Sequence, residues 1–163
     1  MSNGLAVIDI IIRQSWVDYA NFTEDKHRTR EELICHSAIG RHFQDCGIDF
    51  DYMHEKIMDF DFLINGRKII VITMPTRIET DHFDADMFKS LFVRGARKKD
   101  DTDIYLFAAI VRNRVFILGW MSKPIFWDDQ LTSFKSIAKK RYRLVRHDLL
   151  QPMDYLEILL NDD

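Results

Sequence analysis

Two carboxylates stand close together in a segment with the pattern of a β-strand. In residues 58–64 acidic and apolar residues alternate, with Asp59 and Asp61 on one side of the pattern and Phe60 and Phe62 on the other. Hard divalent cations such as Mg²⁺ prefer oxygen ligands, so the pair is a candidate for a weak metal site. A solvent-facing strand edge is the alternative, and it suits Asp59 in particular.

The aspartates lead into the clearest local structural signal of the chain, the stretch FDFLINGRKIIVIT. Asn65 and Gly66 separate two β-rich runs, and Asn-Gly between such runs is typical of a two-residue hairpin turn. On the returning strand, Ile70 and Ile72 are expected on one face because side chains alternate. The sequence therefore predicts a hairpin that carries Asp61 at its start.

This hairpin resembles the core of the PD-(D/E)xK nuclease superfamily, which has the restriction-endonuclease-like fold. Members place an aspartate at the start of the hairpin and, on the returning strand, an acidic residue, any residue and a lysine, often followed by Thr. Asp61 and Thr73 match, but Ile70 and Ile72 stand at the acidic and lysine positions. Two isoleucines offer no metal ligand and no charge. The resemblance therefore implies a degenerate site without a cofactor, or a Mg²⁺ site if activity survives elsewhere.

Other residues would have to complete the site in an active enzyme. The family's first helix often carries an acidic residue that faces the active site. In the helix predicted over residues 29–46, Glu32 is the candidate, and a different count places His36 there. Carboxylates also migrate in this family, which makes loop and cap residues candidates. The candidate catalytic residues are Asp61, Glu32, Glu79 and Lys68, with Asp84, Asp86 and Lys89 as further replacements, and the candidate metal ligands are Asp61 and Asp59. Solvated first-turn and cap residues are the alternative.

Two further stretches resemble the same scaffold. Residues 103–110 and 114–120 are predicted strands, and the second contains the V-x-I-x-G-W pattern that many restriction-like domains share. Residues 142–156 resemble the closing strand and last helix of such domains. The expected fold is thus a single three-layer α/β domain over residues 1–163, with a central mixed β-sheet flanked by helices. Residues 1–26 are expected as an N-terminal extension packing on a core of residues 27–160.

The remaining segments are predicted from local patterns. Apolar residues at helical spacing over 5–19 favour a helix. The β-branched run Ile10 to Ile12 leaves a strand as the alternative. Pro75 is expected to end the second hairpin strand, with a loop over 74–82. Asp84 then begins a helix through about Phe92.

Basic residues gather in two segments. One is the loop 94–99, and the other is the densest basic stretch, residues 135–147, where Phe134 and Tyr142 are interleaved. Cations with aromatic residues suit contacts with nucleic acid. The predicted contact residues are Arg94, Arg97, Lys98, Lys135, Lys139, Lys140, Arg141 and Arg143. A solvated linker beside aspartates and a solvated helix end are the alternatives.

The composition of the chain limits the class of protein to which these sites can belong. The chain has 163 residues and a net charge of −3, which suits one domain and gives no global attraction to nucleic acid. Cys35 and Cys46 lack CxxC spacing and are expected to be reduced thiols of a cytoplasmic protein, without a disulfide or zinc site. The apolar run Leu5 to Ile12 is too short for a membrane span and lacks the features of a signal peptide.

We therefore expect a catalytically silent relative of these nucleases. It would bind nucleic acid, DNA in the first place, or a nucleic-acid-processing protein partner, through a groove beside Asp61, Arg97 and residues 135–146. One alternative is an active Mg²⁺-dependent DNA endonuclease with migrated catalytic residues, and another is a scaffold used only for protein interaction or inhibition. No membrane partner is expected, and homodimer formation stays open. By analogy, a small stand-alone domain of this kind suits a phage or a mobile element.

Overall fold

The computed structural model describes residues 7–25, 27–54, 60–77, 90–94 and 101–161. They form a mixed α/β structure around a six-stranded sheet with the strand order β1-β7-β6-β4-β3-β2. The strands of this sheet are β1 (Ile8–Ile11), β2 (Asp51–Tyr52), β3 (Phe62–Ile64), β4 (Arg67–Arg77), β6 (Ile104–Val111) and β7 (Arg114–Ser122). β4 and β6 run parallel and the other neighbours antiparallel, so the sheet is mixed, as predicted.

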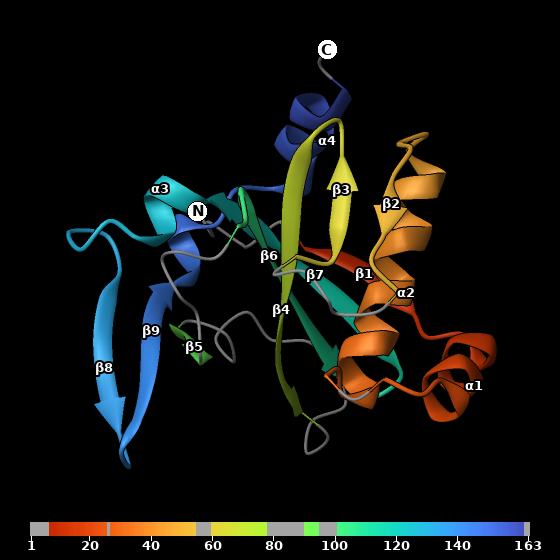
Figure 1. Cartoon of the computed structure of the whole chain (residues 1–163), viewed down its shortest axis with the longest axis horizontal. Helices are drawn as coiled ribbons and strands as arrows, with labels where there is room; N and C mark the ends of the chain where they lie inside the picture. Colours follow the sequence, from red (N-terminus) through yellow and green to blue (C-terminus); the bar gives the residue numbers. More distant parts are fainter. Residues whose placement is uncertain (1–6, 26, 55–59, 78–89, 95–100, 162–163) are drawn as a thin grey trace, which may run out of the picture.

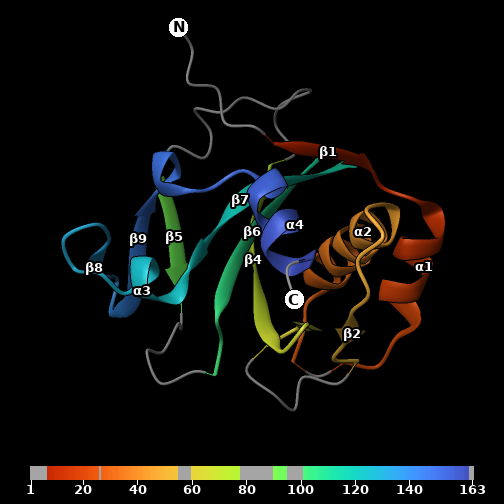
Figure 2. The same cartoon turned by 90° about the horizontal axis from the view of Figure 1, so that it is seen from above.

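Helices cover one face of this sheet (Figures 1 and 2). They are α1 (Gln14–Phe22), α2 (Arg30–Asp45) and α4 (Met153–Asn161). Thr29 caps α2 by accepting a hydrogen bond from the Glu32 backbone N–H, and the chain leaves the helix at Gly47, whose φ is +71°. The helices and the sheet bury a common apolar cluster that includes Ile39, Phe43, Ile69, Leu106 and Leu156.

A second, smaller sheet covers the opposite face. It has the order β5-β9-β8 and is made of β5 (Ser90–Arg94), β8 (Ser133–Ile137) and β9 (Lys140–Arg146). Together with α3 (Lys123–Phe126) it buries a second cluster that includes Leu91, Tyr105, Phe107, Phe126 and Val145. The residues described here thus form three layers, of which the third is a sheet with a short helix instead of the predicted helical layer (Figure 2).

The predicted hairpin is confirmed. Asn65 and Gly66 have φ values of +50° and +77°, the left-handed conformation that a two-residue hairpin turn needs at both positions. β6 is buried along its whole length, which agrees with its apolar sequence. These elements follow local patterns, and the strands β6 and β7 match their predicted positions within about two residues.

Four predictions of secondary structure need correction. Pro75 does not end β4, which continues to Arg77 past a shift in its pairing with β6 between Met74 and Arg77. The expected helix ends in a strand instead, since residues 90–94 form β5, and residues 84–89 lie outside the described part. The first hairpin strand is shorter than the expected stretch 58–64, because β3 covers only Phe62–Ile64 and residues 58 and 59 lie outside the described part. The N-terminal segment is not only an extension, because β1 is an edge strand of the main sheet paired with β7.

None of the described helices combines the length and the apolar character that a membrane crossing requires.

Candidate functional site

Asp61 is a buried carboxylate that the protein itself neutralises. It is 2% exposed. Its Oδ1 accepts a hydrogen bond from Nη2 of Arg28 at 2.9 Å, and its Oδ2 accepts one from the backbone N–H of Val71 at 2.9 Å. The side chain of Arg28 is itself fully buried. A buried carboxylate needs a paired charge, and here a guanidinium supplies it.

Aromatic and titratable side chains from three segments surround this pair. The guanidinium carbon of Arg28 lies 4.9 Å from the ring centroid of Tyr52 and its Nη1 lies 3.5 Å from Asp25. His36 Nε2 lies 3.7 Å from Asp61 Oδ2, and His36 Nδ1 is hydrogen-bonded to the Tyr52 hydroxyl at 2.7 Å. Burial raises the pKa of Tyr52, so this hydroxyl stays protonated and can donate. The result is one connected polar network beneath α2.

The position of Arg28 argues against a divalent cation at Asp61. A cation bound there would have to displace or sit beside a guanidinium that already holds Oδ1. β4 adds no carboxylate on this side, because Ile69 and Val71 point into the cluster under α2 and Thr73, the next residue on that face, offers only a buried hydroxyl. Among the described residues, the donors around Asp61 therefore suit a structural ion pair better than a hard metal ion.

The prediction that Ile70 and Ile72 occupy the acidic and lysine positions beside Asp61 is wrong. Their side chains pack on the second apolar cluster, on the face of the sheet away from Asp61. The reason is an irregularity before β3: the Asp61 N–H bonds to the Ile69 carbonyl although Ile69 is already the partner of Phe62. The bend places the Asp61 carboxylate on the same side as the Phe62 ring, since both contact His36.

The other predicted catalytic residues are scattered. Glu32 lies half-buried in the first turn of α2, and it is His36, one turn on, that reaches Asp61. Lys68 Nζ is 2.6 Å from Asp101, and this hydrogen bond raises the pKa of Lys68. Lys68 is therefore engaged at the sheet surface and not aimed at the Asp61 carboxylate. The candidates Asp59, Glu79, Asp84, Asp86 and Lys89 lie outside the described residues.

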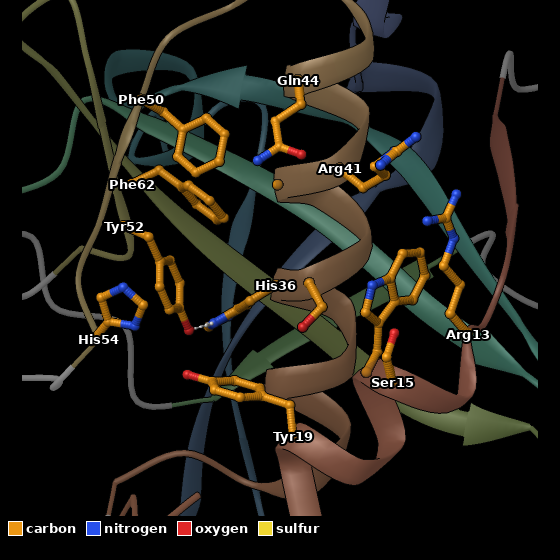
Figure 3. A pocket seen from close by; sticks show the side chains of 13 residues that line it. Arg13, Ser15, Tyr19, His36, Arg41, Gln44, Phe50, Tyr52, His54 and Phe62 are labelled. Atoms are coloured by element: carbon orange, nitrogen blue, oxygen red, sulfur yellow. Dashed lines mark hydrogen bonds between the residues drawn. The ribbon is translucent and has the colours of Figure 1, made fainter.

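A pocket of about 510 Å³ adjoins the buried network, since His36 and Tyr52 belong to both (Figure 3). Its walls come from α1, α2, β2 and β3 and hold the rings of Trp16, Tyr19, Phe50 and Tyr52. Gly40 helps to shape it, because a Cβ there would meet the Phe50 ring at 3.3 Å. The further lining residues are Arg13, Ser15, His36, Ser37, Arg41, Gln44, His54 and Phe62. The pocket is large enough for one ring-containing small molecule.

The outer face of the small sheet carries several basic side chains. The sequences of β5, β8 and β9 contain no Asp or Glu. Residues opposite each other on paired strands share a face. The pairings Arg94–Tyr142, Tyr142–Lys135, Phe92–Leu144, Ser90–Arg146 and Ile137–Lys140 therefore place these side chains together on the outer face.

This outer face combines cations with accessible rings. Arg94, Lys135 and Lys140 are exposed, and Phe92 is 43% exposed although it lies in the middle of a strand. The rings of Phe92 and Tyr142 pack edge to face with centroids 6.2 Å apart. Arg146 is also exposed and lies 3.4 Å from Asp148. We call Arg94, Lys135, Lys140, Arg146, Phe92 and Tyr142 the basic face.

The other basic residues of the predicted segment lie in three different environments. Lys139 stands in the turn between β8 and β9 with a φ of +65°, and Arg141 lies 4.8 Å from the ring centroid of Phe134 on the reverse side of the sheet. Arg143 is buried, with Nε 2.7 Å from Thr132 Oγ1 and Nη2 2.9 Å from Asp129. The prediction that Arg143 contacts nucleic acid needs correction, because its guanidinium holds the preceding loop. Arg97 and Lys98 lie outside the described residues.

The predicted groove beside Asp61 and residues 135–146 does not form. Asp61 lies on the helical side of the main sheet, whereas β8 and β9 lie on the opposite side (Figures 1 and 2). The main sheet separates the two regions. The basic face and the buried network therefore share no common surface among the described residues.

Sequence reasoning missed two groups of residues. Arg28 stands in a mixed-charge stretch before α2, and no local pattern marks it as the partner of a residue 33 positions away. Phe92 was expected inside a helix, so its place on a sheet was not foreseen. The alternation of exposed and buried residues in SLFVR is the signal that could have indicated a strand.

Comparison with known proteins gave no relative from which a function can be read. No family model, no curated protein and no solved structure matches this chain.

Proposed function

We propose that this protein binds single-stranded nucleic acid, DNA in the first place, on the basic face and does not cleave it. The observation that carries the proposal is the combination of exposed cations and accessible rings on one sheet face whose strands contain no acidic residue. The protein as a whole has a net charge of −3, so an attraction for phosphate has to come from a local group of cations such as this one. We interpret the fold as a degenerate relative of the PD-(D/E)xK nucleases.

The chemistry of the face suits a single strand. Lysine and arginine side chains neutralise phosphates, and the release of counterions makes such binding strong at low salt. Exposed rings on a sheet offer stacking platforms for unpaired bases, worth about 1–3 kcal/mol per base. Phe92 and Tyr142 lie between Arg94, Lys135 and Arg146, so bases can stack while the backbone follows the cations. In a duplex the bases are stacked on each other and not available for this contact.

The direct test is fluorescence anisotropy with a labelled single-stranded DNA oligonucleotide and the full chain. The variant Lys135→Glu/Lys140→Glu is expected to weaken binding by roughly 10- to 100-fold at low salt, since two phosphate contacts become repulsive. The dependence of log K on log salt is expected to lose about one unit of slope for each removed contact. The matched control is Arg13→Glu/Arg41→Glu, which makes the same charge change on the helical side of the molecule. Equal losses in both variants, or no binding by the unaltered protein at low salt, would contradict the proposal.

The rings give a second readout at the same face. Phe92→Ala is expected to weaken single-stranded binding by about 5-fold or more without changing the salt slope, because it removes stacking and no charge. Ile158→Ala, an exposed apolar residue of α4, is the matched control. Double-stranded DNA and single-stranded RNA serve as competitors. Preference for the duplex would argue against a stacking mechanism, and preference for RNA would change the ligand while keeping the surface.

Absence of cleavage is a separate prediction. Because Arg28 holds the Asp61 carboxylate, Mg²⁺ or Mn²⁺ is expected to produce no cutting of plasmid or single-stranded DNA above a protein-free blank. The measurement is a gel assay with the wild-type chain and the Asp61→Asn variant. Metal-dependent cutting that disappears in Asp61→Asn would show an active nuclease and overturn the assignment of a degenerate site.

A further inference from the structure

A cluster of three different donor groups lies between α2 and α4, away from both the buried network and the basic face. His42 and Cys46 stand one turn apart on the α2 side, and Glu157 reaches them from α4. One nitrogen, one sulfur and one oxygen atom of these residues all lie within 4.8 Å of one another. His42 and Cys46 are four residues apart, whereas Glu157 comes from a segment 115 residues after His42.

Two of the three separations lie close to those of a tetrahedral zinc site. With Zn–S of about 2.3 Å and Zn–N or Zn–O of about 2.0–2.1 Å, the edges of the tetrahedron are roughly 3.3–3.6 Å. Cys46 Sγ lies 3.5 Å from Glu157 Oε1 and 3.7 Å from His42 Nε2. The third edge, His42 Nε2 to Glu157 Oε1, is a hydrogen bond of 2.8 Å. It would have to open by about 0.5 Å to admit the ion, within the reach of side-chain rotation.

The donor types and the surroundings also fit zinc. Imidazole, thiolate and carboxylate are the three protein ligand types that Zn²⁺ uses, whereas Mg²⁺ takes oxygen donors. His42 and Glu157 side chains are 13% and 23% exposed, so the cluster is sheltered yet open to solvent on one side. On that side a surface hollow is lined by Asp154, Glu157, Ile158 and Asn161. Asp154 precedes Glu157 by one turn on the same helix and could supply the fourth ligand, or a water molecule could.

We propose that His42, Cys46 and Glu157 form a zinc-binding site that ties α4 to α2. Binding displaces the proton of the Cys46 thiol to solvent and forms the Zn–S bond, with no change in oxidation state. α4 is held to the main sheet by its apolar side chains, and the ion would add a link at its outer edge. The site is independent of the proposed nucleic-acid binding, since its residues lie on the helical side of the molecule.

Cobalt is the probe that tests the thiolate directly. The full chain is treated with chelator, freed of it, and titrated with Co²⁺ and then with Zn²⁺. We expect a sulfur-to-cobalt charge-transfer band that saturates at one ion per chain and is lost when Zn²⁺ is added. Cys46→Ser is expected to abolish the band, and Cys35→Ala, which leaves Cys46 in place, is expected to keep it. No band, or a band that survives in Cys46→Ser, would overturn the proposal.

Zinc affinity in competition with a chromophoric chelator gives the quantitative test. Glu157→Gln keeps the size of the side chain, and we expect it to weaken zinc binding by more than the roughly 10- to 100-fold that loss of an outer-shell partner costs. Asp45→Asn, an exposed acidic neighbour on α2, is the matched control and should change affinity little. Unchanged affinity in Glu157→Gln would mean that zinc binds elsewhere and would overturn the assignment. Circular dichroism of each metal-free variant shows whether a loss of binding reflects a loss of folding.

Discussion

Arg28→Ala is expected to lower the free energy of unfolding by about 3–5 kcal/mol, because it leaves the Asp61 carboxylate buried without its charged partner. Both side chains of this pair are almost completely excluded from solvent, so water cannot replace the lost guanidinium without a rearrangement of the surrounding side chains. The packing of Arg28 against the Tyr52 ring would be lost as well. The measurement is urea unfolding followed by tryptophan fluorescence and circular dichroism.

A double variant separates the charge from the packing. In Arg28→Met/Asp61→Asn the methionine keeps much of the volume, and the asparagine oxygen can still accept the hydrogen bond from the Val71 N–H. We expect the double variant to be more stable than the sum of the single losses predicts, because no unpaired charge stays buried. Arg30→Ala is the matched control, since Arg30 is half-exposed and its loss should cost less than about 0.5 kcal/mol. Similar losses in Arg28→Ala and Arg30→Ala would contradict the role of the pair.

Gly119→Ala is expected to destabilise the protein by about 2–4 kcal/mol for two combined reasons. Gly119 has a φ of +142°, which L side chains rarely adopt, and such a conformation costs about 1–3 kcal/mol. A Cβ at this position would also lie 2.7 Å from the Gln151 carbonyl oxygen and 3.0 Å from Leu150 Cβ. Overpacking adds about 1–3 kcal/mol, and here backbone would have to move. The moved segment leads directly into α4.

Gly47→Ala measures the cost of the backbone conformation without the cost of overpacking. Gly47 also has a positive φ, +71°, but nothing lies within 4 Å of the Cβ that alanine would add. Gly47→Ala should therefore lower the free energy of unfolding by only about 1 kcal/mol. A Gly119→Ala variant no less stable than Gly47→Ala would show that the segment around Gln151 yields freely, contrary to its paired hydrogen bonds with Trp120. Thermal unfolding of both variants in one buffer makes the comparison.

Several elements could be predicted because their signals are local. The Asn65-Gly66 turn fixes the hairpin through the backbone conformation of two residues. Thr29 and Gly47 mark the ends of α2 through a side-chain cap and a left-handed residue. The apolar run of β6 indicates a strand covered on both faces, and the two layers described above cover it.

Other predictions of secondary structure were wrong, because packing against distant segments outweighed a local signal. Pro75 was expected to end β4, but pairing with β6 resumes at Arg77 beyond an irregularity, where a missing N–H is tolerated. The segment containing Leu91 and Phe92 resembles a helix by its cap and spacing. It forms β5 because pairing with β9 buries Leu91 and Val93 in the second apolar cluster.

The sequence by itself determined the hairpin at Asn65 and Gly66, the helix α2, the central strands β6 and β7, and the presence of a cation-rich segment near the C-terminus. These features depend on the conformational preferences of neighbouring residues and on periodic burial, which are readable without knowing what lies across the fold. Only the tertiary structure decided the environment of each polar group. It placed Arg28 on Asp61, gathered Arg94 with Lys135 on one sheet face, and brought Glu157 to His42. Such contacts join residues far apart in sequence, and the packing of whole layers selects them because the local chain carries no record of its distant partner.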